Sequence, residues 1–162
     1  MIVVDPLARV SPLADIEDSL RGTRIEIGPR VTIDAFVKIK PAGGSGDVII
    51  GAGSTINSGC VLYTGNGITI GRDVAIAANC TFAPVNHAFR DKGVPIVQQG
   101  FSPSKGGIRV CDDVWIGANC VLLDGAVVGQ GCVIAAGSIV RGTLEPYGVY
   151  GGQPLRRLSE RT

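Results

Sequence analysis

The sequence has few aromatic residues, one histidine and no long apolar run. Only 5% of its 162 residues are aromatic although 45% are hydrophobic, so its core must be built from aliphatic and small side chains. No stretch reaches the roughly 18 apolar residues that cross a membrane. The formal net charge is only +1, which argues against a basic surface that holds nucleic acid. We therefore expect one domain with no membrane span and no nucleic-acid partner.

The sequence also lacks a pattern of paired cysteines. The five cysteines are odd in number and form no C-x-x-C pair, which disfavours both a disulfide framework and a zinc site. We predict no metal. The first residues carry Asp5 and lack a basic segment followed by an apolar run, so they do not resemble a secretory leader. Together these features predict a reducing, cytoplasmic location.

A six-residue repeat dominates what is present. Every sixth residue from Val110 to Val140 is aliphatic, and the same beat runs earlier from Ile27, with interruptions. Four residues after these positions the side chains are mostly small, and Cys60, Cys80, Cys120 and Cys132 fall in that slot. A period of six fits neither an α-helix nor a simple two-sided strand.

The repeat predicts a chain that turns a corner every six residues. Three hexads would close one triangular coil, and the fifteen hexads would stack as about five coils spaced by roughly 4.8 Å. Each coil would pair only with its neighbours. A β-sandwich with glycine-rich turns is the alternative, but it would not keep one phase through six consecutive hexads. We therefore predict an all-β fold, a parallel β-helix.

Breaks in the repeat divide the chain. Residues 1–24 lack the repeat and are interpreted as an N-terminal cap, residues 25–145 as the β-helix, and residues 146–162 as a C-terminal tail. The largest break, a loop over residues 83–108, carries no hexad pattern. Loops of this length in compact domains commonly carry function. It holds the only histidine, His87, and imidazole is the side-chain group that exchanges protons near neutrality.

Several runs resemble one family. These are Asp112–Asn119 with the sequence DDVWIGAN, then Gly137–Val140, and finally Tyr150–Pro154. Together with the hexads and the inserted histidine loop, they resemble the hexapeptide-repeat acyltransferases, in particular the maltose and galactoside O-acetyltransferases and the polysaccharide O-acetyltransferases. The resemblance implies a left-handed β-helix, a homotrimer, and acetyl-CoA as co-substrate with no permanently bound cofactor.

The resemblance also implies site residues. His87 matches the catalytic base, Asn57 matches an acceptor-binding asparagine, and Trp115 matches a tryptophan that lines the site. Positions that contact coenzyme A match Ala118, Ala136, Arg141 and Arg156. The group that orients His87 stays open between Asn86, Asp91 and a backbone carbonyl, and Gln98 and Gln99 are either acceptor contacts or solvated loop residues.

The predicted function is transfer of an acetyl group from acetyl-CoA to a hydroxyl of a sugar or of a cell-surface polysaccharide precursor. The alternatives are an N-acetyltransferase acting on an amino sugar and a non-catalytic β-helix scaffold. A γ-type carbonic anhydrase shares the fold, but its metal needs three histidines and this sequence has one.

Overall fold

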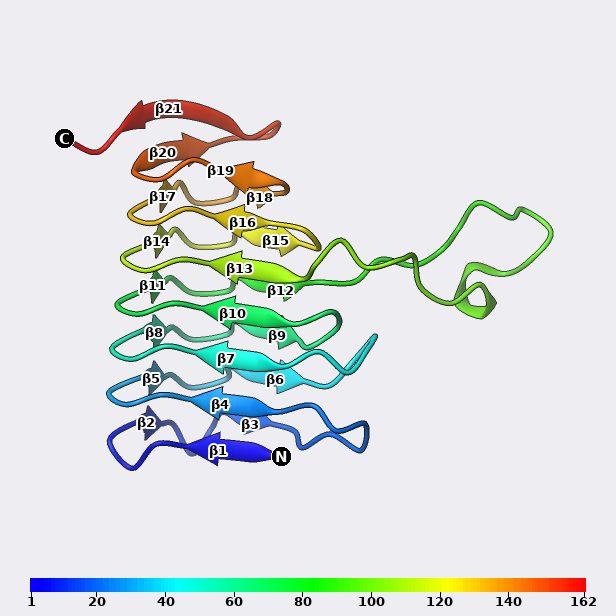
Figure 1. Ribbon diagram of the computed structural model, residues 1–162, viewed down its shortest axis with the longest axis horizontal. Helices are drawn as coiled ribbons and strands as arrows, with labels where there is room; N and C mark the ends of the chain where they lie inside the picture. The colour runs from blue at the N-terminus through cyan, green and yellow to red at the C-terminus, as the bar shows by residue number, and fades with distance from the viewer.

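The chain winds into a three-sided prism with one long arm (Figure 1). The computed structural model describes all residues, 1–162. Three parallel sheets form the walls, and successive strands of the chain pass from wall to wall. In Figure 1 the chain runs leftward along the front wall, returns at the back, and climbs toward the C-terminus. That sense of winding makes the β-helix left-handed, which confirms the predicted fold class.

The strands are two to five residues long and stack in register. The first sheet contains β1 (Ile2–Val4), β4 (Ile25–Ile27), β7 (Val48–Ile50), β10 (Ile68–Ile70), β13 (Ile108–Val110), β16 (Val127–Val128) and β19 (Thr143–Leu144). The second contains β2 (Arg9–Val10), β5 (Thr32–Ile33), β8 (Thr55–Ile56), β11 (Ala75–Ile76), β14 (Trp115–Ile116), β17 (Val133–Ile134), β20 (Gly148–Gly151) and β21 (Arg156–Glu160). The third contains β3 (Asp15–Ile16), β6 (Lys38–Lys40), β9 (Val61–Tyr63), β12 (Thr81–Ala83), β15 (Val121–Leu123) and β18 (Ile139–Val140).

The residues that carry the six-residue repeat form the core of the prism. Residues six apart occupy the same inward position on successive walls, and residues one coil apart pair across each sheet, as Phe82 does with Leu122. All fifteen beat positions are at most 1% exposed. They join the small-slot residues in a single cluster of 30 buried hydrophobic residues. The inward period predicted from the sequence is therefore confirmed.

The predicted inward cysteines lie in this core. Cys60, Cys80, Cys120 and Cys132 are buried, whereas Cys111 is partly exposed. Each buried thiol reaches a backbone carbonyl of a neighbouring turn, for example Cys120 Sγ to Ala135 O at 3.2 Å. Burial raises the pKa of the Cys132 thiol, which keeps it in the protonated form that packs as a small apolar side chain.

The prism has six complete coils and part of a seventh, so it extends beyond the predicted five at both ends. The prediction that residues 1–24 lack the repeat is wrong, because Val4, Val10 and Ile16 keep the six-residue beat and pair with Ile27, Ile33 and Ile39. The beat is hard to see there because this coil closes one end of the core and leaves Val4 44% exposed.

The C-terminal end differs from the prediction in a similar way. The beat restarts at Leu144, two residues earlier than the period requires, and continues at Tyr150, which pairs with Ile134. The chain then reverses, and β21 pairs antiparallel to β20. This hairpin covers the end of the core, where Leu144 and Tyr150 are both 7% exposed. The structure contains no helix of the length and hydropathy required to cross a membrane.

Candidate functional site

The long loop forms an arm that projects from the wall of the prism (Figure 1). It leaves after β12 and returns at β13, so both of its ends lie at the corner between the third and first sheets, here called the third corner. Its stem is a short antiparallel pairing of His87 with Phe101. The amide of Ala88 donates to Gly100 O at 3.0 Å, and that of Ser102 donates to Asn86 O at 2.8 Å. The stem therefore fixes the backbone on both sides of His87.

His87 presents an exposed imidazole on this stem. Its ring centroid lies 4.8 Å from that of Phe101, at an interplanar angle of 45°. No side chain or carbonyl of the chain hydrogen-bonds to the ring nitrogens, although the backbone carbonyl of His87 accepts from Ser102 Oγ at 3.2 Å. Neither Asn86 nor Asp91, the predicted orienting candidates, hydrogen-bonds to the ring. Stacking on Phe101 positions the imidazole, and both nitrogens are left for other partners.

The tip of the arm is organised by Gln99 and ends in exposed apolar side chains. Gln99 Nε2 donates to the carbonyls of Asp91 at 2.8 Å and Val94 at 2.7 Å, which gives this predicted acceptor candidate a structural role. A 3₁₀ turn, η1 (Ile96–Gln98), follows Pro95. Ile96 is 54% and Val97 79% exposed. A patch of this kind on an arm is typical of a contact surface.

Asp124 anchors the returning strand of the arm, a role that sequence reasoning did not assign. It is 5% exposed. Its carboxylate accepts from the amides of Lys105 at 2.8 Å and Gly107 at 2.9 Å, and from Asn66 Nδ2 at 3.2 Å. The only signal in the sequence was the Asp124-Gly pair at a corner, which is also an ordinary turn sequence.

Replacing Asp124 with alanine should destabilise the protein by about 2 kcal/mol, because buried donors lose a charged acceptor. The loss should appear as a lower midpoint of thermal unfolding and as faster proteolytic cleavage within the arm. Asp15→Ala is the matched control, since Asp15 only forms an exposed ion pair with Lys38 at 3.1 Å and such pairs contribute at most about 1 kcal/mol. Equal effects of the two substitutions would contradict the anchoring role.

Four further predicted residues, Asn57, Trp115, Ala118 and Ala136, lie on the second sheet or at the corner between the second and third sheets, here called the second corner. Trp115 lies on β14, points outward between Ala75 and Val133, and is 55% exposed. Asn57 follows β8 at the same corner, and its Nδ2 donates to Ile76 O at 2.7 Å. That bond holds the Asn57 amide against the prism.

Ala118 and Ala136 provide backbone donors at the second corner. The carbonyl of Ala118 accepts from the amide of Gly137 at 2.8 Å, while the amides of Ala118 and Ala136 donate to no group of the chain. Gly117 allows the two turns to stack this closely, since a Cβ there would lie 2.5 Å from Ala136 N. The result is a pair of free N–H groups beside one another, suited to an elongated amide-containing ligand.

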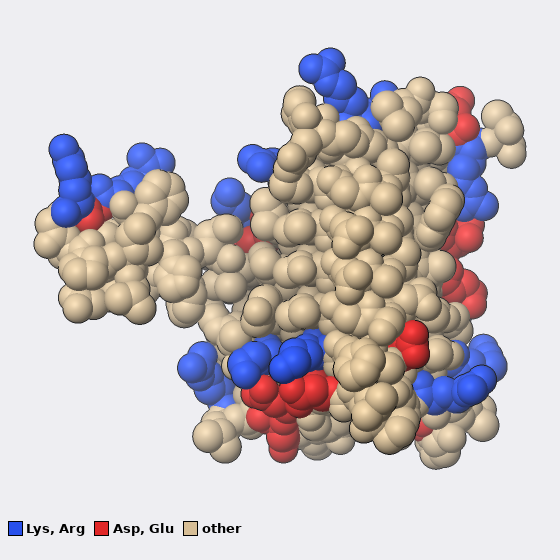
Figure 2. Space-filling model, turned by 180° about the vertical axis from the view of Figure 1, so that it is seen from behind, with Lys and Arg blue, Asp and Glu red and all other residues tan.

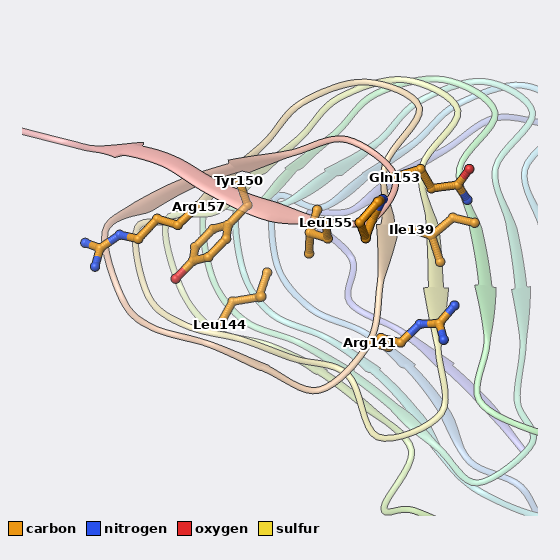
Figure 3. Close-up of a pocket in the computed structure, with 8 residues that line it drawn as sticks. Ile139, Arg141, Leu144, Tyr150, Gln153, Leu155 and Arg157 are labelled. Carbon is orange, nitrogen blue, oxygen red and sulfur yellow. The ribbon is translucent and has the colours of Figure 1, made fainter.

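A pocket of about 360 Å³ lies under the C-terminal hairpin (Figure 3). Its walls include Ile139, Leu144, Tyr150 and Leu155, and two guanidinium groups, those of Arg141 and Arg157, flank it. Of the two predicted arginines, only Arg141 lines this pocket. Alternation along β21 places Arg157, rather than Arg156, among the lining residues.

The single chain does not bring the predicted residues together in one site. His87 stands on the arm beyond the third corner, whereas Asn57, Trp115, Ala118 and Ala136 lie on the second sheet or the second corner. A strand of the third sheet, two or three residues long, separates the two corners in each complete coil, as β12 does. No three His, Cys, Asp or Glu side chains converge in a way that could hold a metal ion.

Comparison with known proteins shows which sequences share this repeat. Residues 107–142 match the family model described as bacterial transferase hexapeptide (six repeats). The chain is 32% identical over 142 residues to the probable acetyltransferase Rv3034c of Mycobacterium tuberculosis, covering 85% of this chain and 45% of that protein. It is 37% identical to the mitochondrial gamma carbonic anhydrase 2 of Arabidopsis thaliana, covering 83% of this chain and 51% of that protein. The chain thus spans about half the length of these curated relatives.

Two further similarities cover more of the other protein. One is the putative lipopolysaccharide biosynthesis O-acetyl transferase WbbJ of Escherichia coli K12, 26% identical, with 83% of this chain and 68% of that protein covered. The other is a solved structure of a point mutant of AntD, an N-acyltransferase from Bacillus cereus, in complex with dTDP-4-amino-4,6-dideoxyglucose and coenzyme A. Its TM-score is 0.81 at 27% identity, and 99% of this chain and 84% of that chain are covered. The chain thus carries the bacterial transferase hexapeptide repeat over residues 107–142, and its left-handed prism is similar to that of an acyltransferase solved with coenzyme A.

Proposed function

We propose that the protein transfers an acetyl group from acetyl-CoA to a hydroxyl of a sugar or of a cell-surface polysaccharide precursor, with His87 as the general base. The observation that carries the proposal is the imidazole of His87, fixed on the stem of the arm with neither ring nitrogen bonded within the chain. A general base needs such a free nitrogen within reach of the proton that it removes. The similarity to acetyltransferases, WbbJ among them, supports the same chemistry.

Coenzyme A is proposed to lie along the second corner. Its pantetheine amides would pair with the free N–H groups of Ala118 and Ala136, and Trp115 would line the channel. Its phosphates would reach the basic end of the prism, where Arg141 shares a pocket with Arg157. Arg156, the position first predicted, extends from the same strand and is exposed. Arginine suits this role because its planar fork matches phosphate oxygens.

The chemical step is a direct attack. His87 would take the proton of the acceptor hydroxyl as that oxygen bonds to the acetyl carbonyl carbon, which gives a tetrahedral oxyanion held by backbone N–H groups. Collapse of this intermediate breaks the carbon–sulfur bond. The sulfur of coenzyme A then leaves as a thiol after accepting the proton from the His87 imidazolium. The products are the acetyl ester and free coenzyme A, so atoms and charge balance.

A homotrimer would complete the site. Trp115, Ala118 and Ala136, which are proposed to hold coenzyme A, lie on the second sheet or the second corner and not at the third corner where the arm leaves. They therefore meet His87 most simply across an interface between two copies. The exposed apolar tip at Ile96 and Val97 supports such a contact. Seen from behind, the middle of the prism face carries little charge, and charged side chains gather below (Figure 2). In a closed ring of three copies, each copy would place its arm against the next copy and receive the arm of the previous one.

Acylation of an amine is the second candidate. It is favoured by the likeness to the AntD N-acyltransferase complex with an amino sugar nucleotide. An amine acceptor would use the same base and thioester, so the two candidates differ only in the attacking atom. Parallel assays with matched hydroxyl and amino sugars separate them.

The experiment that tests the proposed function is release of the coenzyme A thiol from acetyl-CoA in the presence of a panel of sugars, amino sugars and glycans. We expect thiol release that depends on the acceptor, with an acetylated hydroxyl in the product by mass spectrometry and NMR. Acetylation confined to amines would favour the second candidate. If acetyl-CoA neither binds in calorimetry nor loses its thiol, the chain is a scaffold and the proposed function is wrong.

A further inference from the structure

A second pocket opens at the foot of the arm, on the stem that carries His87. Its volume is about 390 Å³, and it lies between the arm and the third corner of the coils above it. Asn86, the neighbour of His87, lies on its wall together with Arg90 of the arm. Lys105 lies on the returning strand of the arm, and Arg141 extends from the end of β18. The pocket thus combines residues from three segments that are far apart in the sequence.

The charges in this pocket are unbalanced. None of the three cationic side chains, Arg90, Lys105 and Arg141, forms a salt bridge within the chain, whereas Lys38, Lys40 and Arg157 each do. The one carboxylate on the wall, Asp124, already accepts from two amides and the Asn66 side chain through its two oxygens. Figure 2 shows basic side chains both on the arm and on the prism beside its foot. The three cations are therefore available to an external anion.

We propose that this pocket binds an anionic group, a carboxylate or a phosphate, carried by the acceptor. The inference rests on the proposed function and narrows the acceptor to an acidic or phosphorylated sugar unit. Two guanidinium groups and an ammonium group provide forked and single charge-assisted donors suited to such oxygens. Asn86 and Ser102 line the pocket, and they flank the pair of His87 with Phe101 in the stem. A bound anion would therefore hold the rest of the same sugar at the stem that carries the imidazole.

The pocket is assigned to the acceptor rather than to coenzyme A because of its position. Arg141 lies between the two pockets and lines both, but Arg90 and Lys105 face only the foot of the arm. Coenzyme A must present its thioester to His87 with its sulfur end, so its phosphates lie at the far end of the molecule from the imidazole. An anion held at the foot of the arm, by Arg90 and Lys105, is therefore assigned to the other substrate.

The test is an NMR titration of the full-length protein with glucose 1-phosphate, glucuronate, uncharged glucose and adenosine 3′,5′-bisphosphate. We expect the two charged sugars, and not glucose, to shift backbone amides within residues 86–90 and 102–107. The double variant R90Q/K105Q should weaken this binding by about tenfold, because two charge-assisted contacts are lost. The control R72Q removes an exposed arginine at another corner and should bind as the parent does.

Two outcomes would overturn the inference: charged sugars that shift no amide at the foot of the arm, or unchanged affinity in the double variant. Binding there of adenosine 3′,5′-bisphosphate alone would assign the pocket to coenzyme A and equally reject it. Calorimetry with coenzyme A on the same samples keeps the two proposals apart. Intact coenzyme A binding with no sugar binding rejects only the anionic acceptor, whereas loss of coenzyme A binding in the parent rejects the acetyltransferase.

Discussion

Replacing His87 with alanine should lower the rate of acetyl transfer by about 10²-fold or more, the usual contribution of a positioned general base. Binding of acetyl-CoA should change little, since none of the proposed coenzyme A contacts lies on the arm. The measurement is steady-state thiol release, with coenzyme A binding followed by calorimetry. Turnover equal to that of the parent would remove His87 from the chemistry.

The fold offers a clean control for this variant. The His87 ring is exposed, forms no hydrogen bond within the chain and lies against the tilted ring of Phe101, so its removal should leave the midpoint of thermal unfolding nearly unchanged. Phe101→Leu removes the stacking partner but keeps the base. It should retain more activity than His87→Ala while loosening the position of the imidazole, a smaller loss that argues for positioning rather than proton transfer.

Mixing variants tests where the site is assembled. If His87 acts on coenzyme A bound to a neighbouring copy, Trp115→Ala and His87→Ala chains refolded together should recover activity that neither has alone. With random assortment, about one quarter of the sites in a cyclic oligomer would combine an intact His87 with an intact Trp115. Recovery near that level supports a shared site. No recovery would place both residues in the site of one chain and contradict the proposed trimer.

The largest effect on stability is expected from Phe82→Ala. Phe82 lies on β12, is 0% exposed, and pairs with Leu62 and Leu122 on the coils above and below. Removing its ring leaves a cavity that stacked coils cannot close, which costs about 3–5 kcal/mol. For a chain of this length the midpoint of thermal unfolding should fall by on the order of 10 °C.

Phe89→Ala is the matched control, because the same atoms are removed from a side chain that is 64% exposed on the arm. Its unfolding free energy should stay within about 0.5 kcal/mol of the parent, as is usual at exposed positions. Similar losses at Phe82 and Phe89 would mean that the arm is packed in solution, against another copy or the prism. That result would revise the stability argument and strengthen the case for the trimer.

The sequence predicted the prism because the hexad is a strictly local rule. A residue points inward every six positions whatever lies on the next coil, so Ile116, Leu122 and their equivalents could be assigned without a structure. The same rule explained the buried cysteines. The repeat was missed at the two ends of the prism. There, Val4 and Tyr150 point inward, but the turns beside them are irregular and a coil stacks on one side only.

The candidate site was less accessible to this reasoning. His87 could be proposed from the sequence because it is the only histidine and lies in the long interruption. The anchoring role of Asp124 could not be predicted, because the amides that it accepts from belong to the end of the arm and reach the third corner only in the folded chain. That Arg157 and not Arg156 lines the end pocket depends on the pairing of β21 with β20.

By itself the sequence determined the winding of the chain, its aliphatic core and the place where the winding is interrupted, since periodicity and burial are encoded residue by residue. Only the tertiary structure decided which groups face one another. It separated His87 from Trp115 by a wall of the prism, freed the amides of Ala118 and Ala136, and gathered Arg90, Lys105 and Arg141 around one pocket. Such contacts depend on how the coils stack and on where the arm leaves and rejoins them. They join residues far apart in the sequence, so no local pattern of residues predicts them.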